Sequence, residues 1–286
     1  MGHGSVKVQG KKFDVKDQYG SLRLEIYGME ITDISEIKDL NKIKKLDALD
    51  LSGNKISEII GLDSLSGLKQ LFLNSNQITE ITGLDSLTNV DRIFLNKNQI
   101  TEIKGLNNLK NLQWLELNEN KLTSLKGIEN LVGIIQLELK ENQITEIKGL
   151  DNLTNLLHLI LSKNNITEIK GLEKLSNLKF LSLDYNKIQE IKGLGALSSL
   201  ENLFLNSNEI AEIKGLDTLT KLENLYLDTN KITEIKGLEK LEKLSLLYLG
   251  MNLIGWEEKR FELNAMGEGN IKKLLEDYKV WKGKGT

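Results

Sequence analysis

An asparagine recurs with a constant 22-residue period through most of this 286-residue chain. The ten positions follow one another without a slip: Asn54, Asn76, Asn98, Asn120, Asn142, Asn164, Asn186, Asn208, Asn230 and Asn252. A fixed period between about 20 and 50 residues is typical of solenoids, in which each unit stacks only on its neighbours. The period therefore indicates an array of similar turns and excludes a single globular core of mixed elements.

Each repeat follows one apolar frame, LxxLxLxxNxIxxIxGLxxLxx. In one repeat the frame consists of Leu68, Leu71, Leu73, Asn76, Ile78, Ile81, Gly83, Leu84 and Leu87. The alternation before the asparagine predicts a short strand, with leucines pointing inward and the residues between them pointing outward. After the asparagine, apolar residues at every third position predict a turn followed by a 3₁₀-like segment. The glycine at repeat position sixteen supplies the φ freedom for that turn.

One such repeat cannot close a core by itself, because it has only seven apolar positions. Stacked repeats can, if each strand pairs in parallel with the next and the inward side chains form a continuous ribbon. An eleventh, degenerate repeat is expected upstream, with Thr32 in the place of the asparagine. Its apolar frame would be Leu24, Tyr27, Met29, Ile34, Ile37, Leu40 and Ile43.

These residues resemble the leucine-rich repeat family. The 22-residue length is similar to the subclass that includes a regulatory subunit of protein phosphatase 1 and the repeat domains of bacterial internalins. The resemblance covers about residues 22–255 and implies an α/β fold: a right-handed solenoid with a parallel sheet on its concave face and 3₁₀ or turn segments on its convex face. It also implies an asparagine ladder that satisfies backbone groups of adjacent turns. Internalins usually carry proline at position sixteen and are exported with surface anchors, so we limit that analogy to the repeat fold.

The predicted organisation has four parts. Residues 1–5 read as the remnant of a tag, 6–23 as an N-terminal cap, 24–255 as the repeats and 256–286 as a C-terminal helical cap. Alternating apolar and polar residues predict a capping strand or hairpin at the N-terminus. Residues 256–282 are expected to form helices, the second with Asn270 as its N-cap. Caps are needed because the ends of the apolar ribbon would otherwise meet water.

The composition excludes several kinds of site. The chain has no cysteine, which excludes disulfides, thiolate metal sites and cysteine nucleophiles and fits a cytoplasmic location. Its 38 basic and 41 acidic residues give no electrostatic footprint for nucleic acid or an anionic membrane. No apolar run approaches the roughly 18 residues of a membrane span. Without a catalytic or metal-binding motif, and with His158 as the single histidine beyond the first five residues, we expect no enzyme, cofactor or metal.

Eight of the fifteen aromatic residues fall at outward positions of the predicted sheet. They are Phe72, Phe94, Trp114, Phe180, Tyr185, Phe204, Tyr226 and Tyr248. Aromatic residues supply many interface anchors, and contiguous apolar patches mark interaction sites. Central repeats carry acids instead, at Glu116, Glu119, Glu138 and Glu141, which predicts two aromatic patches and an acidic region between them. His158 is interpreted as an exposed contact residue on the same face.

These features predict a non-enzymatic scaffold that binds a protein partner on its concave, aromatic-rich face. The phosphatase-subunit resemblance suggests a regulatory role, by fold-level analogy alone. Two alternatives remain open. The rings can instead reflect β propensity and stabilise the sheet without a ligand, and the chain can be a structural, self-associating, duplicated or designed repeat protein with no specific partner. A homo-oligomer is not favoured, and neither nucleic acid nor membrane is an expected partner.

Overall fold

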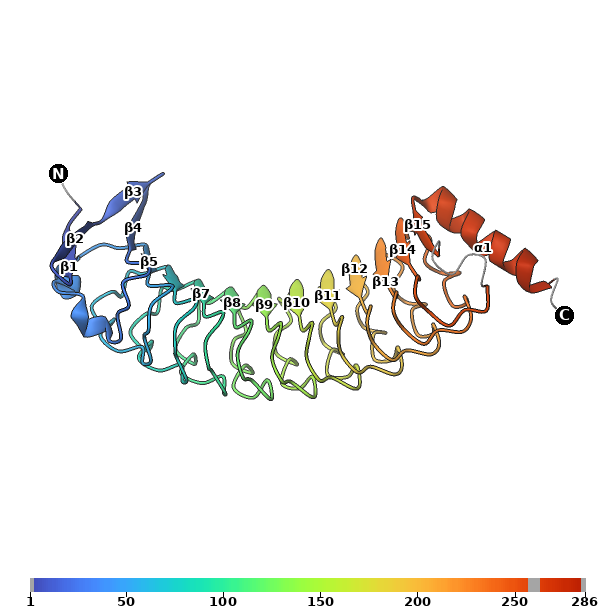
Figure 1. Ribbon diagram of the computed structural model, residues 1–286, viewed down its shortest axis with the longest axis horizontal. Helices are drawn as coiled ribbons and strands as arrows, with labels where there is room; N and C mark the ends of the chain where they lie inside the picture. Colours follow the sequence, from blue (N-terminus) through green and yellow to red (C-terminus); the bar gives the residue numbers. More distant parts are fainter. Residues whose placement is uncertain (1–2, 257–262, 284–286) are drawn as a thin grey trace. The chain divides into compact units, whose positions relative to one another are not determined.

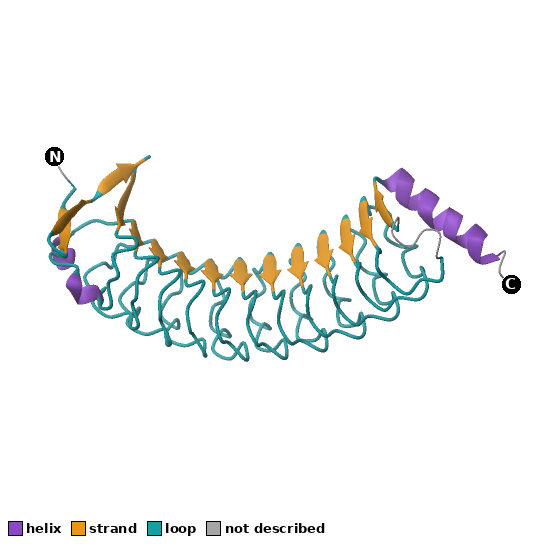
Figure 2. Cartoon of the chain, viewed as in Figure 1, coloured by secondary structure: helices purple, strands orange, loops and turns teal. Residues whose placement is uncertain are grey.

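The computed structural model describes residues 3–256 and 263–283. The chain divides into two units, residues 1–143 (unit 1) and 144–286 (unit 2), and each is a stack of turns. Within each unit the strands lie side by side in chain order (Figure 1), and loops and turns make up the opposite side (Figure 2). The predicted solenoid with a parallel sheet is confirmed.

Unit 1 begins with two antiparallel hairpins, as predicted for the N-terminal cap. The first pairs β1 (Ser5–Val8) with β2 (Lys11–Asp14), and the second pairs β3 (Lys16–Gln18) with β4 (Ser21–Glu25). From β4 onward every strand of the unit pairs in parallel with the next. These strands are β5 (Ala48–Asp50), β6 (Gln70–Phe72), β7 (Arg92–Phe94), β8 (Trp114–Glu116) and β9 (Gln136–Glu138).

The described part of unit 2 contains five parallel strands followed by one antiparallel strand. The parallel strands are β10 (His158–Ile160), β11 (Phe180–Ser182), β12 (Asn202–Phe204), β13 (Asn224–Tyr226) and β14 (Leu246–Tyr248). β15 (Asn264–Met266) pairs antiparallel with β14, and the helix α1 (Glu268–Gly283) packs against both strands. Ile271 and Tyr278 are the buried residues of α1, so the helix covers the end of the ribbon.

The core of each unit is a ribbon of leucine and isoleucine side chains. The inward strand residues Leu71 and Leu73 and the turn residue Ile78 have no exposed surface. Opposite the sheet, the N–H of Leu65 donates to the carbonyl oxygen of Leu62 at 2.9 Å, and the same i to i+3 bond recurs in later repeats. Among the described residues, regular 3₁₀ helix is confined to η1 (Ile34–Glu36) and η2 (Leu40–Lys42) in the first turn.

Each repeat asparagine is buried and links two turns, which confirms the predicted ladder. Asn76 Nδ2 donates to the carbonyl oxygens of Leu73 in its own turn, at 3.1 Å, and of Leu51 in the preceding turn, at 3.0 Å. Its Oδ1 accepts a bond of 3.0 Å from the N–H of Ile56. Equivalent bonds recur at Asn98, Asn120 and Asn142 in unit 1 and at Asn186, Asn208, Asn230 and Asn252 in unit 2.

The first turn has a different phase from the one predicted. Leu24 pairs in register with Leu49, whereas Leu49 pairs with Leu71, so the first turn is three residues longer than the next. Met29 therefore takes the asparagine position that was assigned to Thr32, and Tyr27, expected to point inward, is 70% exposed. The additional residues lie in the turn that contains η1 and η2. Because apolar residues recur here at every third position, a slip of three leaves the apolar pattern unchanged.

Two predictions for the C-terminal cap are wrong. Residues 264–266 form β15 instead of helix, because the outer edge of β14 has backbone groups that need hydrogen-bond partners. The helix begins at Glu268, and Asn270, the predicted N-cap, already lies in its first turn, where its N–H donates to the Gly267 carbonyl oxygen at 3.1 Å. Residues 257–262, also expected to be helical, lie outside the described residues.

A glycine at position sixteen is required by space as well as by conformation. Gly237 has a φ of 73°, and a Cβ there would lie 2.6 Å from the carbonyl oxygen of Ile213. Gly237→Ala is therefore expected to destabilise the protein by more than about 2 kcal/mol in urea unfolding. Gly195 has no positive φ, and a Cβ added to it would meet nothing within 4 Å, so Gly195→Ala should stay within about 1 kcal/mol of wild type. Equal losses in the two variants would contradict the steric explanation.

Removing one amide of the ladder should leave backbone groups unpaired in the interior. Asn208→Ala removes bonds to the carbonyl oxygens of Leu183 and Leu205 and to the N–H of Ile188, and we expect a loss of about 2–4 kcal/mol of unfolding free energy. Asn177 is the matched control, because its exposed amide makes a single 2.9 Å bond to a carbonyl oxygen. Asn177→Ala should cost less than about 1 kcal/mol. Similar losses, measured by chemical denaturation, would show that the ladder does not hold the turns.

Candidate functional site

The outward side chains of the strands form one surface in each unit, which we call the sheet face. It consists of repeat positions three, five, seven and eight, counted from the first leucine of the frame. Position eight has a left-handed backbone in every repeat from Ser75 to Met251, with φ between 53° and 58°. Side chains at position eight therefore leave the strand at a different angle from those at positions three and five.

In unit 1 the rings of Phe72, Phe94 and Trp114 form a series that we call the unit 1 ring stack. The centroids of Phe72 and Phe94 are 4.5 Å apart with an interplanar angle of 3°, and those of Phe94 and Trp114 are 5.9 Å apart at 51°. Arg23 lies over Phe72 at 5.2 Å and Arg92 lies over Trp114 at 5.6 Å. Both outer rings of this stack thus have an arginine of the chain itself beside them, from β4 for Phe72 and from β7 for Trp114.

The unit 2 ring stack consists of His158, Phe180, Phe204, Tyr226 and Tyr248. His158 meets Phe180 edge to face at 6.1 Å, and Phe180 lies 5.0 Å from Phe204 at 37°. Phe204 stacks on Tyr226 at 4.4 Å and Tyr226 stacks on Tyr248 at 4.9 Å. Seven of the eight predicted aromatic site residues therefore belong to two continuous stacks, one in each unit.

Tyr185 is the predicted aromatic residue that joins neither stack. It lies at position eight, is 53% exposed, and has the Lys163 ammonium 6.0 Å from its ring centroid. The stacked rings, by contrast, are half-buried by one another. Ring pairs of this kind contribute about 0.5–1.5 kcal/mol beyond the area they bury. The rings therefore stabilise the sheet in addition to presenting a surface.

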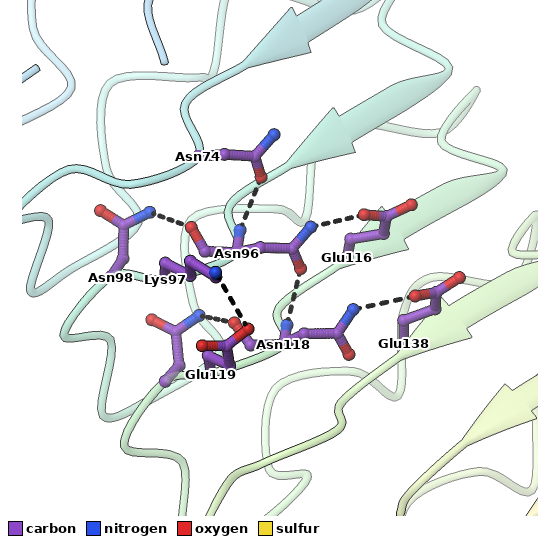
Figure 3. A network of polar contacts seen from close by, with 9 residues as sticks. Asn74, Asn96, Lys97, Asn98, Glu116, Asn118, Glu119 and Glu138 are labelled. Atoms are coloured by element: carbon purple, nitrogen blue, oxygen red, sulfur yellow. Dashed lines mark hydrogen bonds and ion pairs between the residues drawn. The ribbon is translucent and has the colours of Figure 1, made fainter. Parts of the chain in front are cut away.

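The predicted acids of unit 1 fall into two groups. The carboxylates of Glu116 and Glu138 lie on the strands and are held by neutral donors (Figure 3). Glu116 accepts a 2.9 Å bond from the Trp114 indole and a 2.5 Å bond from Asn96, while Glu138 accepts a 2.8 Å bond from Asn118. Glu116 and Glu138 are thus held in place by uncharged partners.

The other group, Glu119 and Glu141, lies at position eight with φ of 55° and 56°. Glu119 is exposed and pairs with the ammonium of Lys97 at 3.6 Å. An exposed pair of this kind contributes about 0–1 kcal/mol and leaves both groups accessible. These two acids flank the row of Glu116 and Glu138 and do not belong to it.

Sequence reasoning missed a second amide ladder, at position seven. Asn74 Oδ1 accepts from the N–H of Asn96 at 2.9 Å, and Asn96 Oδ1 accepts from the N–H of Asn118 at 2.8 Å (Figure 3). The side-chain N–H groups of Asn96 and Asn118 then donate to the carboxylates of the following turn. The signal in the sequence is three consecutive asparagines at this position, and its consequence is that the two carboxylates have fixed orientations.

Burial changes the electrostatics of this surface in both units. It raises the pKa of Glu116 above its usual value, and the nearby charge of Glu138 acts in the same direction, against the bonds from Asn96 and Trp114. In unit 2, burial raises the pKa of Asp228, to which the charge of Asp184 also contributes. Carboxylates that are partly stripped of water and bonded only to neutral donors are stabilised when a cation approaches.

The described residues contain no group of three or more histidine, cysteine or acidic side chains that could hold a metal ion. None of the helices in the described part of the chain is long and apolar enough to cross a membrane. His158, expected to be exposed, is half-buried and has Phe180 as its ring neighbour; its role as a contact residue stays a prediction.

The raised pKa of Glu116 gives a titration test. We expect its carboxyl, followed by carbon-13 NMR, to titrate above 4.5, and Glu138→Gln to lower that pKa by removing the like charge. The folded protein takes up this proton at a higher pH than the unfolded chain. The contribution of Glu116 to the free energy of unfolding should therefore rise as the pH falls through its folded pKa towards 4.5. A Glu116 titration at or below 4.5 would contradict the effect assigned to burial.

Family models match both units. A model described as "Leucine-rich repeat" matches residues 19–126, and one described as "Leucine Rich repeats (2 copies)" matches residues 154–196 and 198–240. No curated protein sequence matched the chain. The matches do not bear on the resemblance to a protein phosphatase 1 regulatory subunit.

Solved structures of bacterial repeat proteins are similar to this chain. An internalin, InlF, from Listeria monocytogenes is 27% identical with a TM-score of 0.69, over 82% of this chain and 75% of that one. Internalin C2 of the same organism is 35% identical with a TM-score of 0.59, over 62% and 78%. A leucine-rich repeat protein of Leptospira interrogans is 26% identical with a TM-score of 0.60, over 80% and 72%. Together with the asparagine ladder and the parallel sheet, these matches show that the chain belongs to the leucine-rich repeat family.

Proposed function

We propose that this protein is a non-enzymatic scaffold that binds a protein partner through its sheet face. Leucine-rich repeat proteins are generally scaffolds for protein interactions. The observation that carries the proposal is the gathering of seven aromatic residues in two stacks, one on the sheet face of each unit. The repeat interior is built almost entirely from leucine and isoleucine, so these rings are not an extension of the core.

Rings in this arrangement suit protein recognition. Each presents a large apolar area with few rotatable bonds, and its neighbours already hold it in place, so little side-chain freedom is lost on binding. The polar groups beside them are also oriented, as the bonds from Asn96 to Glu116 and from Asn118 to Glu138 show. A surface ordered before binding gains affinity mainly because the entropy cost of association is smaller.

The charges favour a partner with basic residues. In unit 1, Glu116 and Glu138 lie on the strands with neutral hydrogen-bond donors. In unit 2 the charge of Asp228 acts on Tyr226, and Asp184 is close enough to act on Asp228. Phosphate groups of a nucleic acid would be repelled by these carboxylates. The cytoplasmic location remains a prediction from the composition alone.

The test combines Phe204→Ala, Tyr226→Ala and Tyr248→Ala in one variant. A partner is first identified by affinity purification from cell extract with the wild-type protein, and its dissociation constant is then measured with purified components. The variant should bind at least about tenfold more weakly, because aromatic anchors carry much of the binding energy of an interface. Circular dichroism and urea unfolding establish that the variant is folded.

The matched control is Lys192→Ala with Lys214→Ala on the turn side, where both lysines pair with exposed glutamates. These changes should leave the dissociation constant within about twofold of wild type. A folded triple variant with unchanged affinity would overturn the proposal. Concentration-dependent dimerisation of the wild type in light scattering, lost in the triple variant, would instead favour the self-associating alternative.

A further inference from the structure

The two ring stacks end differently. In unit 1, Arg23 and Arg92 lie over the two outer rings, as cation–π contacts at 5.2 and 5.6 Å. In unit 2 the last ring, Tyr248, stacks on Tyr226 at 4.9 Å. Among the described residues no second ring and no cation lies over the other face of Tyr248. The described part of the chain therefore leaves this end of the unit 2 ring stack open.

That end borders a groove of about 430 Å³ between β14, β15 and α1. Its apolar walls include Tyr248, Trp256 and Met266, of which Met266 is 66% exposed. From α1 come Lys273 and Asp277, four residues apart and so on the same face of the helix. The groove thus offers an aromatic ring, apolar walls and a carboxylate within one small volume.

The residue opposite Tyr248 in the sheet does not compete for the ring. Asn264 pairs with Tyr248 in register, but its Oδ1 accepts bonds of 3.1 Å from the N–H groups of both Leu249 and Gly250. The Asn264 carboxamide is therefore committed to the backbone of the preceding strand end. These two bonds turn the Asn264 side chain towards the backbone of residues 249 and 250. The groove beside Tyr248 is therefore not filled by this side chain.

We propose that this groove receives an arginine side chain from a basic segment of the protein partner, with the guanidinium over Tyr248 and near Asp277. The proposal rests on the sheet-face function proposed above, and it specifies one contact between the partner and this chain. Its precedent lies in the same molecule, because an arginine lies over each of two rings of the unit 1 stack, Phe72 and Trp114. A planar, weakly hydrated guanidinium stacks on a ring and pairs with a carboxylate at the same time, which an ammonium does less well.

The charges around the groove support a cationic occupant. At repeat positions two, seven and eight, which flank the strands of unit 2, the acids Asp184, Glu201, Glu223 and Asp228 outnumber the lysines Lys163 and Lys179, and Lys179 is already paired with Glu201 at 3.1 Å. Inside the groove Lys273 opposes the occupant and Asp277 attracts it. The apolar walls suit the methylene stem of arginine, which packs along apolar surface while its head is held by charge.

The experiment is an NMR titration of the full chain with N-acetyl-arginine N-methylamide as the probe. We expect weak, saturable binding that shifts the Tyr248 ring and Trp256 indole signals. N-acetyl-citrulline N-methylamide has nearly the same shape without the charge, and it should bind at least about threefold more weakly. Tyr248→Leu should weaken arginine binding about threefold to tenfold, since one cation–π contact is lost.

Variants of the two charged residues in the groove test the proposal without changing the Tyr248 ring. Lys273→Gln should strengthen binding of the arginine probe and Asp277→Asn should weaken it, each by about twofold to fivefold. Tyr19→Leu, at an exposed ring outside both stacks, is the matched control and should leave the titration unchanged. Lys273 is exposed, so its variant keeps the proposal testable if Tyr248→Leu does not fold.

Equal binding of the citrulline and arginine probes, or no response to Lys273→Gln, would overturn the proposal. The outcome is separable from that of the sheet-face function. If the variant lacking three rings loses its partner while the arginine probe shows no preference over citrulline, the sheet face stands and the arginine contact is rejected. If the arginine probe binds selectively but the triple variant keeps its partner, the sheet-face function fails, and with it the partner assignment of this groove.

Discussion

The structure depends on one side-chain group, the carboxamide of the repeat asparagine. A chain that turns back once in every repeat buries backbone N–H and C=O groups where each strand gives way to a loop, and buried groups of this kind need partners. A single carboxamide supplies both donors and an acceptor. From one position, Asn76 therefore bonds two carbonyl oxygens and one N–H in two successive turns. Aspartate lacks the donors, which explains why the position is asparagine in ten turns of this chain.

The fold requires apolar residues at the inward positions and asparagine at position nine. The residues that can vary between repeats therefore lie mainly on the sheet face. The stabilising role of the rings there and their proposed role in binding do not exclude each other. Stacking of Phe204 on Tyr226 stabilises neighbouring strands, and the same contact fixes the position of both rings before any partner arrives. The interpretation that rings only stabilise the sheet leaves one feature unexplained. At repeat position five, where other repeats carry stacked rings, Glu116 and Glu138 are acids held by neutral amides.

The period predicts whatever each repeat specifies locally: the strands, the asparagine ladder, the position-sixteen glycine and the column that contains Phe204 and Tyr226. It does not predict features that depend on neighbours outside the frame. The phase of the first turn is predicted wrongly, because the spacing of three from Ile34 to Ile37 fits the repeat frame in two positions that differ by three residues. β15 forms because the edge of β14 needs a partner, which no local pattern in residues 264–266 reveals. The diagonal contact of Phe180 with Phe204 joins two columns and follows only from their geometry in three dimensions.

The proposed preference for a basic partner has a physical basis in the carboxylates of the free protein. A carboxylate that loses hydration without gaining an ion partner is raised in energy, and the raised pKa of Glu116 reflects that loss. The bonds from Asn96 and Trp114 orient the charge but do not neutralise it. An approaching basic side chain restores the missing electrostatic stabilisation, whereas a carboxylate already paired with lysine, such as Glu119, gains less. The neutral amide ladder at position seven therefore keeps these carboxylates in place without neutralising them, which is the state that the proposed recognition of a basic partner requires.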